Sequence, residues 1–175
     1  MHFKQKISGI GKKAGGTAAS TFLALGLAYA QGIDMNQKVQ SNNPAYTAVM
    51  DSVLTLSFSS FSIDTSQIDS VFAKMRRAGY TTIKTSYNNV IEYGTAADAF
   101  GGGSYSYASD PFNCKIYRII KDGEVIGWIT DKETKRPLMN EFGQPDPFNS
   151  YTDRSLSIFF AKTPKGEELK NLLGF

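Results

Sequence analysis

The sequence predicts an α+β fold, with an N-terminal signal or anchor helix and then one small domain that has an antiparallel sheet and two or three helices. Three observations predict it. Apolar residues recur at helical spacing beside capping residues, alternating residues mark several strands, and an Asp-Gly pair separates two apolar runs. The predicted divisions are a signal peptide or membrane anchor at 1–30, a linker and helix at 31–55, and an α+β globular head at 56–175.

The first thirty residues have the pattern of an export signal. Residues 1–13 contain four lysines and no acid, and residues 14–30 are uncharged and mostly small or apolar. Ala28 and Ala30 form a small-x-small triplet with Tyr29, which is typical of a signal peptidase site. We therefore expect export to the periplasm, cell surface or medium, and contact with the inner membrane through this segment before processing.

The charge balance changes once this segment is set aside. The chain has 19 Lys and Arg and 16 Asp and Glu; four of the basic residues and none of the acids lie in residues 1–30. The remainder therefore carries 15 minus 16, a formal charge of −1. A nearly neutral chain has no basic surface for a nucleic acid backbone, so we expect no nucleic acid partner.

The residue types needed for common catalytic sites are scarce. The single histidine is His2 and the single cysteine is Cys114. Ser-His-Asp and Cys-His mechanisms need an imidazole base, and zinc sites draw on several Cys and His ligands. The glycines of 101–103 lack the Lys-Ser/Thr ending of a phosphate-binding loop. We expect no enzyme, no cofactor and no metal.

Two helices are predicted before the first long strand. Asn43 and Pro44 mark the start of one, whose apolar stripe includes Tyr46 and Met50. The segment 56–63 is either its end or a short strand. A second helix is predicted over 64–79, capped by Asp64 and ended by Gly79.

The strands follow in the second half. Residues 80–87 predict a strand, and 90–93 are either a separate strand after a turn at Asn88-Asn89 or the continuation of the first. Residues 104–107 alternate strictly. The runs 116–121 and 124–129 flank Asp122-Gly123, a pair typical of a two-residue hairpin turn, and Trp128 is expected in the core. A last strand over 156–161 precedes a helix that begins at Thr163-Pro164 and stops at Gly174.

Residues 131–153 are the segment that sequence patterns leave open. Three prolines, Gly143 and several Asn and Asp predict either a long surface loop with a function or a strand pairing that local patterns do not show. Phe142, Phe148 and Tyr151 are candidate interface residues in this segment. Cys114, which opens a predicted strand, is either a buried inert thiol, the interpretation we favour, or a fourth interface residue.

The order of these segments resembles that of the type IVb pilins. The leader end Lys12–Gly16, the Ala-Phe-Gly-Gly of 99–102 and the late strand-Pro-helix unit over 158–173 resemble motifs of that family. The resemblance implies processing after Gly16, and a hydrophobic helix that anchors the subunit and later packs in a fibre core. The chain differs from the family at Thr21, where a glutamate is expected.

We therefore expect an exported, non-catalytic structural or assembly subunit of a cell-surface or envelope structure, pilin-like, that has protein partners or assembles with itself. The alternative is a soluble periplasmic or secreted binding module that uses the 131–153 loop.

Overall fold

The computed structural model describes residues 39–97, 104–140 and 142–175. They contain a five-stranded antiparallel sheet of order β2-β8-β7-β6-β3 and three α-helices. In chain order these elements are α2 (Pro44–Leu56), β2 (Ser57–Ile63), α3 (Ile68–Arg77), β3 (Thr81–Val90), β6 (Phe112–Lys121), β7 (Glu124–Met139), β8 (Pro145–Ala161) and α4 (Pro164–Leu173). The predicted α+β domain is confirmed. The predicted signal or anchor helix, with Gly16, Ala28 and Ala30, lies outside the described residues, as does the Phe-Gly-Gly segment.

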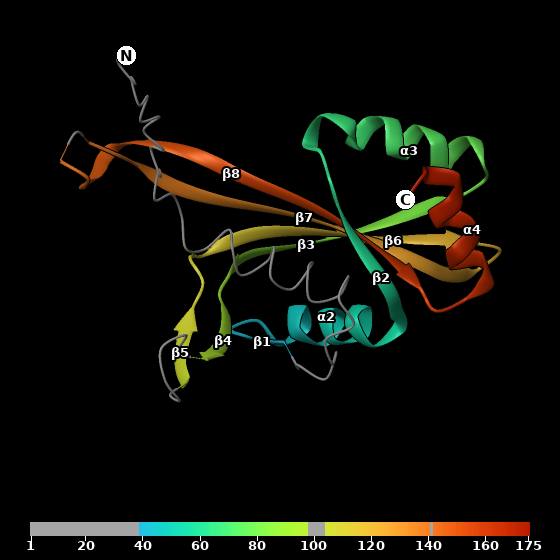
Figure 1. Ribbon diagram of the computed structural model, residues 1–175, viewed down its shortest axis with the longest axis horizontal. Helices are drawn as coiled ribbons and strands as arrows, with labels where there is room; N and C mark the ends of the chain where they lie inside the picture. The colour runs from blue at the N-terminus through green and yellow to red at the C-terminus, as the bar shows by residue number, and fades with distance from the viewer. Residues whose placement is uncertain (1–38, 98–103, 141) are drawn as a thin grey trace, which may run out of the picture.

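The sheet is covered by helices on both faces, α3 and α4 on one and α2 on the other (Figure 1). Each face has its own apolar cluster. Along β8 the side chains alternate between them: Ile158 and Phe160 pack with the α3 and α4 side, and Phe159 packs with the α2 side. This is the two-residue period of a strand buried on both faces.

Helix α2 begins where the sequence predicts. The Asn43 side chain accepts a hydrogen bond from the Tyr46 backbone N–H, and Pro44 occupies the first turn. Tyr46 and Met50 are buried in one cluster with Ile116 and Trp128 of the sheet. Helix α2 therefore packs against this face of the sheet.

Helix α4 also begins and ends at its predicted signals, whereas α3 covers only Ile68–Arg77 of the helix predicted over 64–79. Asp64 caps a short 3-10 turn, η1 (Thr65–Gln67), that leads into α3, and Thr163 caps α4. Gly174 ends α4 with a φ of 87°, a left-handed value that favours glycine. A Cβ on Gly166 would collide with the carbonyl of Ala161, so this glycine lets α4 lie close against the end of β8.

The β6–β7 hairpin matches its prediction in detail. Asp122 and Gly123 have φ values of 52° and 79°, as a type I′ turn requires. Trp128 is buried in the cluster under α2, so its predicted place in the core is confirmed.

The structure decides two predictions that left alternatives open. Asn88-Asn89 does not form a turn, because β3 continues to Val90 through an irregularity at which Asn89 has a φ of 51°. The chain then enters a second, three-stranded sheet of order β1-β4-β5, formed by β1 (Gln40–Ser41), β4 (Glu92–Ala97) and β5 (Ser104–Ala108). Asparagine tolerates left-handed backbone both in turns and in bulges, so the residue pair does not distinguish them.

The second concerns residues 131–153, where the alternative of a strand pairing is confirmed for the described residues. Strand β7 continues to Met139 and β8 begins at Pro145, with Lys135 opposite Thr152 and Pro137 opposite Ser150. The prolines are tolerated because each strand here has a neighbour on one side only.

Candidate functional site

The outer part of the β7–β8 hairpin extends beyond the rest of the sheet. Strand β6 pairs with β7 only as far as Thr134, and β2 pairs with β8 only from Leu156 onward. Residues 135–140 and 142–152, here called the arm, therefore form a two-stranded ribbon that projects along the long axis of the molecule (Figure 1).

The arm concentrates exposed apolar side chains. Of the ten large hydrophobic residues exposed in the described part of the chain, half lie on it: Leu138, Met139, Phe142, Phe148 and Tyr151. Phe148 is 91% exposed and Phe142 is 79% exposed. Apolar groups gathered in water are typical of a surface that another molecule covers. Three of the four candidate interface residues thus lie together at this site.

A bulge in the arm presents Phe148. Between the pairs Pro137–Ser150 and Met139–Pro145, β7 contributes one residue and β8 contributes four. The Asp146 carboxylate accepts hydrogen bonds from the Asn149 side chain at 2.7 Å and from the Phe148 backbone N–H at 2.9 Å. These bonds lower the pKa of Asp146, the bond from the Asn149 side chain most, so the carboxylate is ionised near neutral pH. A charged side chain therefore organises the bulge that carries the most exposed aromatic ring.

An ionic network fixes the base of the arm. Asp131, only 1% exposed, accepts two hydrogen bonds from Arg154 across the β7–β8 pair, at 2.7 and 2.9 Å. Lys115 of β6 lies 3.0 Å from Glu133, and Glu133 lies 3.7 Å from Arg154. Hydrogen bonding to Asp131 raises the pKa of Arg154, as expected for a bidentate pair. The network joins three strands at the point where the arm leaves the sheet.

A second polar cluster lies on the α2 face. Lys132 Nζ is 2.9 Å from Glu92 Oε1, and the Tyr46 hydroxyl donates to the same oxygen at 2.5 Å. The ammonium also lies 4.6 Å from the centre of the Phe112 ring. Burial lowers the pKa of Lys132, while the Glu92 carboxylate opposes that shift. This cluster attaches β4 to the main sheet.

Cys114 adjoins that cluster and is 1% exposed. Burial raises its pKa to about 12, so the thiolate that would act as nucleophile is scarce at neutral pH. The predicted burial of the thiol is confirmed, and the raised pKa agrees with low reactivity. Cys114 does not join the other candidate interface residues at the surface, because its strand is covered by α2.

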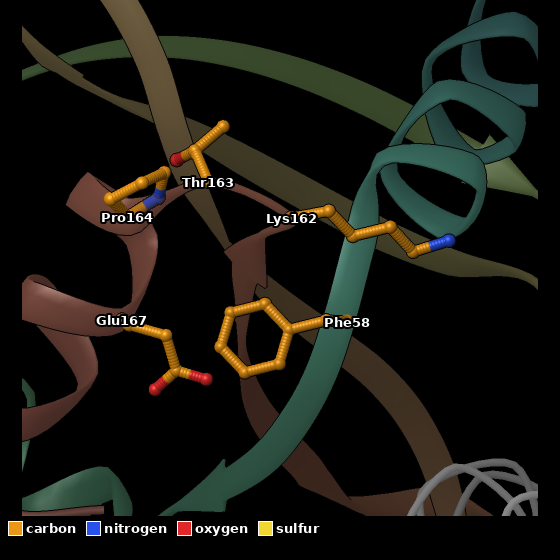
Figure 2. A pocket seen from close by; sticks show the side chains of 5 residues that line it. All are labelled: Phe58, Lys162, Thr163, Pro164 and Glu167. Atoms are coloured by element: carbon orange, nitrogen blue, oxygen red, sulfur yellow. The ribbon is translucent and has the colours of Figure 1, made fainter.

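An open depression lies at the end of the molecule opposite the arm. Phe58 of β2, Pro164 and Glu167 of α4, and Lys162 and Thr163 between β8 and α4 line it, with a volume of about 460 Å³ (Figure 2). The Phe58 ring and the Pro164 ring supply apolar surface, and the Glu167 carboxylate lies beside the Phe58 ring. The Lys162 side chain runs away from them, and its Nζ donates a hydrogen bond to the Thr55 carbonyl at 3.1 Å. Sequence patterns miss this depression and the Lys132 cluster, because both join residues far apart in the chain.

Within the described ranges, no cluster of three or more Cys, His, Asp or Glu side chains is placed to bind a metal ion. None of the described helices is long and apolar enough to cross a membrane. In comparisons with known proteins, no family model, no curated protein and no solved structure matches the chain, so its function has to be inferred from its own residues.

Proposed function

We propose that the protein is an exported, non-catalytic assembly subunit that contacts a protein partner through the arm. The observation that carries the proposal is the concentration of exposed apolar residues on a ribbon that projects away from the core. Leaving such a surface in water is unfavourable, and a partner that covers it gains the free energy of burial.

The state of the buried polar groups supports a structural role over a catalytic one. Lys132 is held by Glu92, Asp131 is held by Arg154, and the thiol of Cys114 is protonated at neutral pH. The paired Lys132 and Asp131 stabilise the domain, and the Asp131–Arg154 pair fixes the direction of the arm. The arm itself contributes no cluster of nucleophile and base among its described residues.

The pilin-like form of the proposal and the export of the chain rest on the sequence. N-terminal sequencing of the protein recovered from its native host tests both. A start at Thr17 in membranes or fibres supports the pilin-like form, and a start at Gln31 in a soluble fraction favours the periplasmic or secreted binding module. Retention of Met1 in a soluble cytosolic form contradicts export altogether.

Photo-crosslinking tests the role of the arm. A photoreactive phenylalanine analogue at position 148, in the full chain in its native host, is expected to form a crosslink to a protein, identified by mass spectrometry. The same analogue at Leu172, which is 42% exposed on α4, serves as the control. Equal crosslinking from the two positions, or none from position 148, would contradict the proposal.

A further inference from the structure

We propose that two copies of this chain pair through the outer edges of their β3 strands, so that the two five-stranded sheets become one continuous sheet. The contact is antiparallel, and its two-fold axis passes between the two copies of Thr85. The edge of β3 is a different surface from the arm, so this inference does not depend on the proposed function.

Strand β3 has a strand partner on one side only. It ends the order β2-β8-β7-β6-β3, and its partner among the described residues is β6. The backbone N–H and C=O groups on its outer edge form a template for another strand. The molecule that satisfies these groups best is an extended chain segment, because only a strand presents donors and acceptors at the same spacing.

This edge is accessible from both faces of the sheet. Residues 81–86 are all exposed, so the helices on the two faces leave this part of β3 uncovered. The first buried residue of the strand is Tyr87. A second strand can therefore approach to the ladder spacing of about 4.8 Å without meeting a helix.

The other strand edges have features that discourage pairing. Strand β2, at the opposite edge, has seven residues, of which one is exposed, and β1 and β5 of the small sheet have two and five residues. The edges of the arm contain Pro137, Pro145 and Pro147, which lack the N–H that a ladder needs. Strand β3 has ten residues, no proline or glycine, and a single charge, Lys84. Among these edges, β3 is the one without a device against strand addition.

The residues of β3 are complementary to a second copy of the same strand. Paired residues in a continuous sheet share a face, so the two-fold axis must pass through a residue position. With the axis at Thr85, Ile83 lies opposite Tyr87 of the second copy, and Lys84 lies opposite Ser86. Each of these pairs occurs twice by symmetry, and none brings like charges directly opposite each other.

The neighbouring registers are less favourable. An axis at Lys84 would set two ammonium groups directly opposite each other, which is destabilising. An axis at Ser86 would set Ile83 opposite Asn89, where the ladder of β3 is irregular. An axis at Ile83 would shorten the paired segment to residues 81–85. Charge, regularity and length therefore all favour the axis at Thr85.

Pairing in this register also covers apolar surface. The Ile83 side chain is 47% exposed in the single chain. Across the axis it meets Tyr87, and pairs of β-branched and aromatic residues stabilise antiparallel sheets. The threonines that flank Ile83 and occupy the axis are β-branched and suit a ladder.

A charge at the axis tests the pairing. Thr85→Lys and Thr85→Asp each set two like charges opposite each other, so each variant is expected to be monomeric. An equimolar mixture of the two sets opposite charges across the axis and is expected to form a heterodimer. Thr85→Val, which keeps the shape without a charge, is the matched control. Because Thr85 is exposed, each variant is expected to keep the circular dichroism spectrum and melting temperature of the parent.

Sedimentation velocity of the processed chain, purified from its host, measures association. The parent and Thr85→Val are expected to show a dimer whose fraction rises with concentration. A parent that stays monomeric, a Thr85→Lys variant that associates like the parent, a monomeric Thr85→Val or a monomeric mixture would each overturn the proposal. The crosslink from position 148 reports on the arm, so failure of either test leaves the other inference standing.

An engineered disulfide tests the register directly. Opposite residues of an antiparallel pair have Cα atoms about 4.5–5.5 Å apart, a separation that a disulfide can span. Thr85→Cys, in a Cys114→Ala background, is therefore expected to give a covalent dimer on a non-reducing gel after mild oxidation. Thr81→Cys is the control, because its two copies would lie about 27 Å apart along the ladder. Equal dimer from both positions, or none from position 85, would overturn this register.

Discussion

The inner and outer parts of the β7–β8 hairpin share two strands and one antiparallel ladder, yet they have opposite environments. In the inner part, Trp128, Ile129 and Ile158 are buried between the helices on the two faces. In the arm, Phe142 and Phe148 are exposed. The two strands pair with each other in both parts. Helices cover only the inner part, so only the apolar residues there are buried in the core. The uncovered part is then free to serve binding.

The largest expected contrast is between the two aromatic residues of this hairpin. Trp128→Ala is expected to lower the free energy of unfolding by about 3–5 kcal/mol, because it leaves a cavity under α2. Phe148→Ala is expected to change it by less than about 0.5 kcal/mol, because the ring has little contact with the fold. Urea denaturation followed by circular dichroism measures both, and similar losses would show that the arm is part of the core.

The next contrast is between two ion pairs formed by β7. Glu92→Leu leaves the Lys132 ammonium buried without its carboxylate and is expected to cost about 3 kcal/mol. Asp153→Ala removes the partner of Arg136, 3.4 Å away at the arm, and is expected to cost less than about 1 kcal/mol because the Asp153 side chain is half-exposed. Thermal and urea unfolding give both values. A larger loss from Asp153→Ala would mean that the arm stabilises the domain.

A smaller difference in stability is expected between substitutions in the two turns that flank β7. Gly123 and Gly143 both have left-handed φ values, 79° and 74°. Gly123→Val is expected to cost about 1–3 kcal/mol, because the strained turn is tied to the core through the β6–β7 ladder. Gly143→Val is expected to cost less, because the arm tip can open locally without unfolding the sheet. Hydrogen exchange is expected to show faster exchange confined to the arm in the second variant, and faster exchange of the core amides would contradict this.

Near neutral pH the smallest expected effect is the pH dependence that Cys114 adds beside the inner hairpin. Its folded pKa of about 12 lies above the value of about 8.5 for a free thiol. The stabilisation is complete below about pH 8.5 and is lost as pH rises toward 12, because the unfolded thiol releases its proton first. Stability of the parent should fall above pH 8.5 by up to about 1.4 kcal/mol per pH unit more than that of Cys114→Ala. Parallel curves for the two proteins would mean that the thiol is accessible to water in the folded state.

Local patterns predicted the elements whose signals lie within a few residues of each other. Asn43, Thr163 and Gly174 mark helix ends through hydrogen bonds or φ values set by adjacent backbone. Asp122-Gly123 predicted its hairpin for the same reason. For residues 131–153 local patterns left a surface loop and a strand pairing both open, because prolines such as Pro137 and Pro145 fit a strand only where it lies at an edge.

The sequence by itself determined the helices, the β6–β7 hairpin, the burial of Trp128 and the shortage of catalytic residue types, since these follow from composition and short-range periodicity. Tertiary structure alone decided that residues 135–140 and 142–152 project as an arm, that Lys132 of β7 meets Glu92 of β4, and that Phe58 and Pro164 share a depression. Those features depend on which strands stop pairing first and on contacts between residues up to about a hundred positions apart. Neither the point at which strand pairing stops nor a long-range contact produces a periodic pattern in a single sequence.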